Sequence, residues 1–353
     1  MRSLNFVVGT GRCGSTALSR VLRRHPEVLS VNELLSSVAP AALPPGTLTG
    51  AGFWRLLAEP NPFFDAMVRY GTRVPEFLYP RSPGRFSPDS GVPAVAMMVL
   101  PHLTDDPDGL FDQLAGEVPG WPERPVEDHY TALFRWLCER FGRTVAVERS
   151  GFSLQWTDAL ARRFPSARLV HMYRDGPDCA LSMSRHPGFR LVVLENRIKA
   201  LTGAAAIPEL APDDVAALPP ELAAVLPDRF DPAALEQPLP LEEFADLWSR
   251  QIADAAARLS AVPAPRRYAL GYEDLLADPY AELSRLAAYL DLEPDPDWLA
   301  AARELLDPAR AGAARALPAD RFALLREWCA PGLRALEALA GTAPATAEEE
   351  AWT

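Results

Sequence analysis

The sequence has 353 residues, 48% of them hydrophobic, and its 47 acidic against 35 basic residues give a net charge of −12. This predicts a globular chain with a sizeable core and disfavours general binding to nucleic acid or to an anionic membrane. With no apolar run near the ~20 residues of a membrane span, no signal-peptide pattern and four scattered cysteines without zinc spacing, we expect a cytoplasmic protein.

Short apolar runs alternate with helical patterns along the chain. Strands are expected at Leu4–Val8, Val28–Val31, Val92–Leu100, Thr144–Val147, Ala167–Tyr173 and Arg267–Leu270. Helices are expected at Ser15–His25, Tyr130–Phe141, Leu154–Phe164, Asp178–Arg185, Leu241–Val262, Pro279–Leu290 and Ala319–Leu339. The alternation predicts an α/β fold with a mostly parallel central sheet flanked by helices, whose ligands lie beyond the carboxyl ends of the strands.

Two stretches interrupt this pattern within what we expect to be a single domain over residues 1–345, followed by a flexible tail at 346–353. Residues 203–241 are rich in Ala, Pro and Asp, and surface decoration or partial disorder is slightly favoured there over a substrate lid. Residues 36–91 are expected to form a packed cap with an apolar pocket, because so many aromatic residues are poorly suited to disorder. These aromatic residues are Phe53, Trp54, Phe63, Phe64, Tyr70, Phe77 and Tyr79.

The glycine-rich turn after the first expected strand is the first candidate binding site. Residues 9–14 (GTGRCG) fit the GxGxxG pattern of dinucleotide-binding folds, and Glu33 lies where a ribose-binding acid would be sought. Residues 9–16 also fit a Walker A loop in which Ser15 replaces the lysine. Without that lysine, ATP or GTP hydrolysis is disfavoured.

These alternatives share one physical feature, an anion at the N-terminus of a helix. Unpaired backbone N–H groups and the positive end of the helix dipole attract it there. Arg12, Ser15 and Thr16 add side-chain donors. One guanidinium and two hydroxyls over such a turn suit a terminal group with less charge than a triphosphate and with no metal ion.

A second strand, turn and helix repeat this arrangement at residues 167–187 (ARLVHMYRDGPDCALSMSRHP). Arg174 ends the expected strand and Ser182 lies eight residues later, so both can converge on one phosphate. Taken alone, the segment would be interpreted as a surface pair of Arg174 and Asp175 with serines facing solvent. A dehydrogenase has no evident use for such a phosphate site.

The two segments together resemble the sulfotransferases that use 3′-phosphoadenosine 5′-phosphosulfate (PAPS), and look closer to the bacterial and protein-tyrosine branch than to the cytosolic branch. The resemblance implies a P-loop-NTPase-like fold in which the first loop binds the 5′-phosphosulfate and Arg174 and Ser182 bind the 3′-phosphate. The loop residues are Gly11, Arg12, Cys13, Gly14, Ser15 and Thr16. Three further segments resemble the family: residues 25–33 (HPEVLSVNE), 147–156 (VERSGFSLQW) and 270–292 (LGYEDLLADPYAELSRLAAYLDL).

The resemblance also implies roles for single residues. Glu33 falls on the catalytic glutamate of the family, and Arg149 stands where a sulfate-contacting lysine is usual. Tyr272 and Arg185 are candidates for the adenine and ribose end of PAPS. The nearest basic residues to the family's late cofactor-binding position are Arg315 and Arg321.

The expected reaction is in-line transfer of a sulfuryl group from PAPS to a hydroxyl of a small molecule, lipid or secondary metabolite, catalysed by positioning and charge stabilisation. Glu33 is the first candidate for the general base, and His102 is the second. His171 is expected in the core. The remaining histidines, expected at helix ends or in loops, are His25, His129 and His186.

No metal, nucleic acid or stable membrane insertion is expected, and a homodimer is left open. Two alternatives to the sulfotransferase also stay open. One is a P-loop enzyme resembling nucleotide kinases, which Ser15 in the lysine position disfavours. The other is a nucleotide-binding protein of the same fold that has no catalytic activity.

Overall fold

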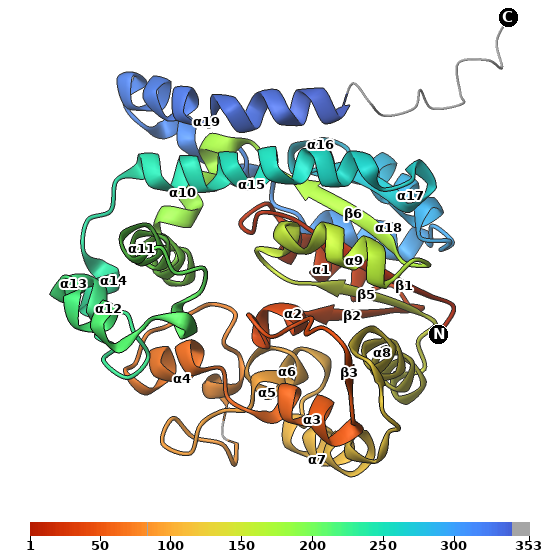
Figure 1. The fold of residues 1–353 in the computed structure, drawn as a ribbon. Helices are drawn as coiled ribbons and strands as arrows, with labels where there is room; N and C mark the ends of the chain where they lie inside the picture. The colour runs from red at the N-terminus through yellow and green to blue at the C-terminus, as the bar shows by residue number, and fades with distance from the viewer. Residues whose placement is uncertain (83, 341–353) are drawn as a thin grey trace, which may run out of the picture.

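The centre of the molecule is a parallel sheet. The computed structural model describes residues 1–82 and 84–340, and within them a five-stranded sheet has the order β2-β5-β1-β6-β7 with every neighbouring pair parallel (Figure 1). The strands are β1 (Ser3–Val8), β2 (Val28–Asn32), β5 (Val145–Arg149), β6 (Arg168–Tyr173) and β7 (Arg267–Gly271). The predicted α/β fold is confirmed, together with five of its expected strands.

The strand expected at Val92–Leu100 is wrong. Most of this run is helical, in α5 (Ala94–Met98) and α6 (Leu100–Leu103). All of its hydrophobic residues are buried, because the segments that precede and follow the run pack against it. A continuous apolar run has neither the two-residue nor the 3.6-residue period, so its pattern could not separate a buried helix from a buried strand.

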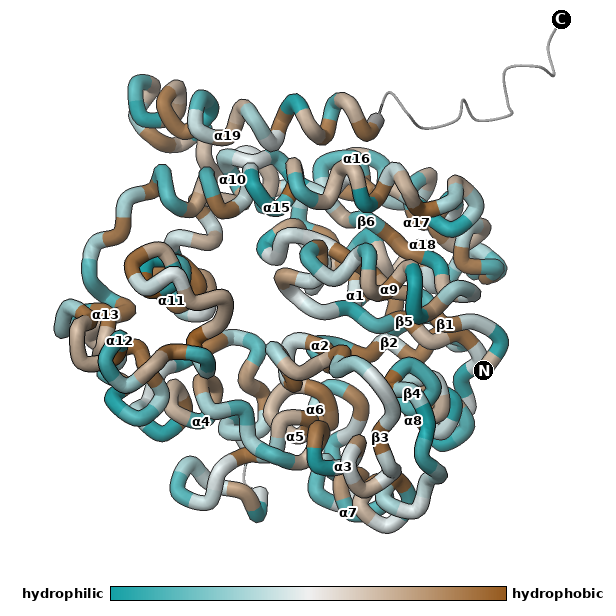
Figure 2. Tube along the Cα trace, viewed as in Figure 1, coloured by the Kyte–Doolittle hydropathy of each residue, from teal (hydrophilic) through white to brown (hydrophobic). Residues whose placement is uncertain are grey.

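Helices cover both faces of the sheet. Their bounds are α1 (Ser15–Leu22), α8 (Val126–Phe141), α9 (Thr157–Arg163), α10 (Gly176–Ser184), α15 (Leu241–Ala261), α16 (Tyr272–Ala277), α17 (Pro279–Tyr289), α18 (Pro296–Leu305) and α19 (Ala319–Ala340). Figure 2 shows hydrophobic residues along the strands, while α15 and α19 alternate between hydrophobic and hydrophilic residues. This amphipathic pattern lets α15 pack against α10 and α19.

Residues 36–91, the cap segment, fold into short helices beside the sheet. This region holds α2 (Leu34–Ser37), α3 (Gly50–Ala58) and α4 (Pro62–Arg69), and it is followed by α7 (Pro107–Glu117). Its β3 (Thr47–Leu48) pairs antiparallel with β4 (Arg124–Pro125). Asn61 fixes the start of α4, because its side chain accepts from the N–H groups of Phe63 and Phe64 and donates to the carbonyl of Ala39.

The second interruption is also folded. It follows α11 (Pro187–Thr202) and contains α12 (Pro212–Ala217), α13 (Pro220–Ala223) and α14 (Ala233–Glu236). Proline at the first turn suits α12 and α13, because the N–H that proline lacks would have no partner inside the helix. Val225, Leu226 and Phe230 are buried, which favours an ordered segment over partial disorder.

Within the described residues, no helix has both the length and the apolar character needed to cross a membrane. The flexible tail expected at residues 346–353 lies outside the described part of the chain. Because the strands of the sheet are parallel, the residues that follow them meet at one edge: Gly9, Glu33, Ser150, Arg174 and Tyr272. Topology therefore brings the predicted site residues Glu33, Arg174 and Tyr272 to this edge.

Candidate active site

The loop between β1 and α1 depends on glycine at two positions. Gly11 and Gly14 have φ angles of 75° and 91°. A Cβ atom at Gly11 would stand 2.3 Å from the ring of Phe189, and one at Gly14 would stand 2.2 Å from the ring of Tyr272. Both positions therefore require glycine for space as well as for backbone conformation, and two rings from distant parts of the chain hold the loop in shape.

The loop offers backbone donors at the N-terminus of α1. Across residues 1–82 and 84–340, no oxygen atom accepts a hydrogen bond from the N–H groups of Gly11, Arg12, Gly14 or Thr16. The side chain of Cys13 is buried, and burial raises the pKa of its thiol, so this residue can offer a ligand only its backbone. Free N–H groups at the positive end of a helix dipole form an anion site.

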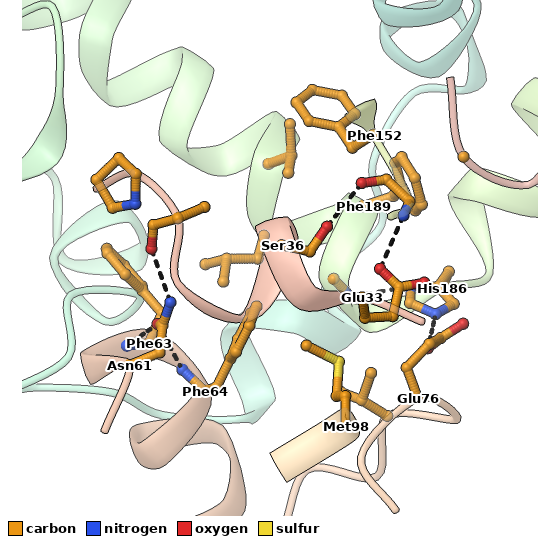
Figure 3. Close-up of a pocket in the computed structure, with 18 of the residues that line it drawn as sticks. Glu33, Ser36, Asn61, Phe63, Phe64, Glu76, Met98, Phe152, His186 and Phe189 are labelled. Carbon is orange, nitrogen blue, oxygen red and sulfur yellow. Dashed lines mark hydrogen bonds and ion pairs between the residues drawn. The ribbon is translucent and has the colours of Figure 1, made fainter. Parts of the chain in front are cut away.

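Arg12 connects this loop to two other parts of the chain. Its Nε donates to the hydroxyl of Ser182 on α10 at 3.1 Å, and its Nη1 donates to Oε1 of Glu76 in the cap segment at 3.3 Å. The other carboxylate oxygen of Glu76 lies 2.9 Å from Nε2 of His186 (Figure 3). Burial favours a higher pKa for Glu76, but the hydrogen bond and charge of His186 and the charge of Arg12 outweigh it and hold that pKa at about 2.

Sequence reasoning did not identify Glu76 or His186 as site residues. His186 was expected at a helix end, and it is indeed the N-cap of α11, where its Nδ1 accepts from the N–H of Gly188 at 3.2 Å. With Nδ1 accepting, Nε2 carries the proton that is donated to Glu76. The available signal was weak: Glu76 is a lone carboxylate within the otherwise apolar stretch VPEFLY, residues 74–79.

Glu33 and Arg149, from the ends of two neighbouring strands, form a buried ion pair. Arg149 Nη1 contacts Oε1 of Glu33, and the side chains are 5% and 7% exposed, respectively. The other carboxylate oxygen of Glu33 accepts from the N–H of Gly151 at 2.7 Å. The backbone N–H of Glu33 donates to the carbonyl of Arg149 at 2.7 Å, which fixes the two strand ends together. The Glu33 carboxylate thus has a fixed orientation.

His102, the second base candidate, lies on α6. Its Nδ1 is 3.2 Å from the side-chain nitrogen of Asn32, and it does not line the cavity that Glu33 lines. Burial and the charges of Arg23, Arg149 and Arg20 lower the pKa of His102 to about 4. His171 lies in β6 and is buried, where burial lowers its pKa to about 4.

Arg174 contacts the backbone of the loop, whereas Ser182 contacts the side chain of Arg12. Its Nη1 donates to the backbone carbonyl of Arg12 at 3.3 Å, and its Nη2 donates to Asp178 at 2.8 Å. Its guanidinium lies 5.0 Å over the ring of Tyr272. Its buried Nε has no hydrogen-bond acceptor in the described part of the chain, although Oε1 of Glu273 forms an ion pair with it at 4.0 Å. This atom can therefore still donate a hydrogen bond to a ligand.

Arg174 lines a second cavity of about 420 Å³, together with Glu273 and Arg315. Tyr272 is 5% exposed and packs between Gly14 and Arg174, so its ring supports the loop. Arg185 is exposed at the end of α10. Neither Arg185 nor Arg321 lines either cavity.

The main cavity has a volume of about 530 Å³ and is polar at one end. Arg12, Ser15, Thr16, Glu33 and Arg149 line that end. Apolar side chains from the cap segment and from α5 and α11 form much of the wall, and Figure 3 shows several of them: Phe63, Phe64, Met98 and Phe189. Ala206 and Ile207, from the second interruption, also reach it. Over the described residues, no His, Cys, Asp and Glu side chains gather in a group of three or more that could hold a metal ion.

Solved sulfotransferases have a similar arrangement of the chain. The sulfotransferase domain from the curacin biosynthetic pathway is 14% identical, with 96% of this chain and 98% of that chain covered and a TM-score of 0.48. The sulfotransferase domain from the Synechococcus olefin synthase is 16% identical, with coverage of 93% and 94% and a TM-score of 0.42. A sulfotransferase from Alicyclobacillus acidocaldarius is 15% identical, with coverage of 97% and 96% and a TM-score of 0.38.

No protein-family model and no curated protein matches the sequence. The choice of a reaction therefore depends on the residues of the site and their contacts.

Proposed function

We propose that this protein is a sulfotransferase that moves a sulfuryl group from PAPS to a hydroxyl of a small-molecule, lipid or secondary-metabolite acceptor. The proposal rests on the contacts that Arg12 and its loop make. Its loop has free backbone donors and a serine in place of the Walker lysine, while Ser182 contacts its guanidinium and Arg174 its carbonyl. Two anion-binding motifs thus meet at one residue, as a nucleotide with phosphates at both ends of its ribose requires.

The residues fit PAPS as a co-substrate. The N–H groups of residues 11–16, with Arg12, Ser15 and Thr16, would hold the 5′-phosphosulfate and stabilise charge on the departing phosphate. Ser182 and the unsatisfied Nε of Arg174 would hold the 3′-phosphate. Arg315, which lines the second cavity together with Arg174, would add a further positive charge there.

The acceptor hydroxyl would enter from the main cavity. Its oxygen forms a bond to sulfur while the bond from sulfur to the bridging phosphate oxygen breaks, and its proton passes to the carboxylate of Glu33. Arg149 and the N–H of Gly151 orient that carboxylate toward the cavity edge. A general base of this kind typically contributes ~10² to 10⁴ in rate. The aromatic wall suits a largely apolar acceptor.

The test is calorimetric binding of adenosine 3′,5′-bisphosphate, the expected product, against adenosine 5′-monophosphate. We expect the 3′-phosphate to tighten binding about tenfold or more, because hydrogen bonds to charged groups contribute about 1.5–3 kcal/mol each. Ser182→Ala should lose most of this difference. Ser184→Ala is the matched control, because its hydroxyl lies on the same helix and only donates to the carbonyl of Leu181.

Equal affinity of the wild-type protein for the two nucleotides would contradict PAPS as the donor. Transfer of labelled sulfate from PAPS to a panel of phenols and alcohols then tests the reaction itself. A protein that binds the bisphosphate but transfers no sulfate to any of them would instead favour the inactive nucleotide-binding protein.

A further inference from the structure

Two ionisable side chains of the main cavity make no hydrogen bond or ion pair among the residues that the structure describes. Its other ionisable side chains form ion pairs: Glu33 with Arg149, and Glu76 with both Arg12 and His186. Glu195 and Lys199 also line this cavity, on α11, yet in the described part of the chain neither side chain makes a hydrogen bond or an ion pair. Their i, i+4 spacing would permit a direct pair, so its absence leaves both groups available to a ligand.

The positions of these two side chains along α11 show how far they lie from the N-terminal end of the helix. Gly188, Val192, Glu195 and Lys199 repeat at helical spacing and all line the cavity, so one face of α11 follows its length. Gly188 contacts His186, which is joined through Glu76 to Arg12 at the polar end. At 1.5 Å per residue, Glu195 lies about 10 Å along the helix axis from Gly188. An acceptor with its reacting hydroxyl at the polar end would extend past apolar side chains before it reached Glu195.

The surroundings of Glu195 restrict the chemistry of this ligand group. Burial raises the pKa of Glu195 to about 7, and the charge of Lys199 lowers it only in part. A purely apolar ligand would bury both side chains without partners, which is costly. A cationic group would be repelled by Lys199 and an anionic group by Glu195. A neutral group that both donates and accepts hydrogen bonds satisfies the two side chains together.

We propose that Glu195 and Lys199 bind a second polar group of the acceptor, a neutral hydroxyl or a group of equivalent hydrogen bonding, at a point about 10 Å further along α11 than Gly188. The proposal rests on the proposed function, because it takes the main cavity as the acceptor site. The acceptor is then a largely apolar molecule with polar groups at both ends. Glu195 and Lys199 select it by its length and by its far end.

The experiment compares two rigid probes, biphenyl with a hydroxyl at both para ends and biphenyl with a single para hydroxyl. Calorimetry with the full chain and saturating adenosine 3′,5′-bisphosphate gives their affinities without requiring turnover. We expect the diol to bind the wild-type protein about tenfold or more tightly than the mono-hydroxyl probe, the effect of one hydrogen bond to a charged group. Glu195→Leu should bring this ratio close to one, because the diol loses a hydrogen-bond partner while the apolar end of the mono-hydroxyl probe no longer buries an unpartnered carboxyl group.

Glu209→Leu is the matched control, because Glu209 is exposed beside the cavity-lining residues 206–208 and does not line the cavity itself. It should keep the wild-type ratio. Equal affinities of the two probes for the wild-type protein, or a ratio that survives in Glu195→Leu, would overturn the proposal. Sulfate transfer to the mono-hydroxyl probe is measured separately. A preserved diol preference without any transfer would support the Glu195–Lys199 site and contradict the sulfotransferase assignment.

Lys199 provides an independent measurement, because it is the only lysine in the sequence. Acetylation by an amine-reactive ester, located by peptide mass spectrometry, therefore reports on this cavity at one side chain. The diol should protect Lys199 from acetylation at concentrations where the mono-hydroxyl probe does not. Equal protection at equal occupancy of the cavity would contradict contact between the second hydroxyl and Lys199.

Discussion

Glu76→Gln tests whether the carboxylate of the cap segment opposes anion binding at Arg12. Glu76 Oε1 lies 3.3 Å from Arg12 Nη1. An anion bound to the same guanidinium would lie roughly 3 Å beyond it, hence about 6 Å from the carboxylate. With an effective dielectric constant of about 20, repulsion at that separation is ~3 kcal/mol for each unit of ligand charge. At physiological salt, where the screening length is about 8 Å, roughly half remains.

The remaining ~1.4 kcal/mol corresponds to about tenfold in affinity for each unit of ligand charge, and a terminal phosphate carries about 1.5 to 2 units. We therefore expect Glu76→Gln to bind adenosine 3′,5′-bisphosphate at least about tenfold more tightly than the wild-type protein in calorimetry. The difference should narrow as salt is raised, because the repulsion is screened. Glu59→Gln is the control, since Glu59 is an exposed carboxylate of the cap segment outside the cavity and its loss changes the net charge equally.

Unchanged or weaker binding by Glu76→Gln, in a protein that melts at the wild-type temperature, would refute this reasoning. It would mean that Glu76 orients the Arg12 guanidinium for the anion, and that this orientation outweighs the repulsion. A tenfold gain in Glu59→Gln as well would also refute it, since the effect would then come from net charge.

Two further predictions concern carboxylates at the strand ends. Glu33→Gln should reduce turnover by ~10² or more and leave affinity for the bisphosphate nearly intact, in sulfate-transfer and calorimetric assays; turnover at the wild-type rate would contradict Glu33 as the base and favour His102. Burial raises the pKa of Glu148 from 4.5 to about 7, so its contribution to stability is present below pH 4.5 and is lost as pH rises through about 7. This loss amounts to up to ~3 kcal/mol of unfolding free energy. In denaturant unfolding, the stability of Glu148→Gln should therefore fall less between pH 5 and pH 8 than that of the wild-type protein. Identical pH dependence of the two proteins would exclude titration of Glu148 as the cause.

The sheet and its phosphate-type loops could be predicted because their signals are local. An apolar run followed by glycines and then a helical pattern contains the whole of the β1 loop and α1 in residues 3–22. Parallel strands then bring Glu33, Arg149 and Arg174 to one edge, so their shared location followed from the fold class.

The remaining features depend on contacts between distant segments. Glu76 meets Arg12 across 64 residues and His186 across 110, and nothing in the local sequence of the cap segment indicates either partner. Arg174 was expected to face a ligand, but most of its guanidinium is engaged by Arg12, Asp178 and the carbonyl of Arg310. A sequence pattern shows residue types and their spacing. It does not show which hydrogen-bond donors already have acceptors within the folded chain.

The ring of Phe189 fills the space beside Gly11, and Phe189 belongs to the same helix as Glu195. A ligand that displaces α11 therefore alters the room available to the anion-binding loop, and an anion that tightens the loop limits the movement of α11. Such coupling is reciprocal: if one ligand changes the affinity of the other by some factor, the second ligand changes the affinity of the first by the same factor. In the proposed reaction, the contact of Phe189 with Gly11 would thus be one route by which the nucleotide and the acceptor influence each other's binding.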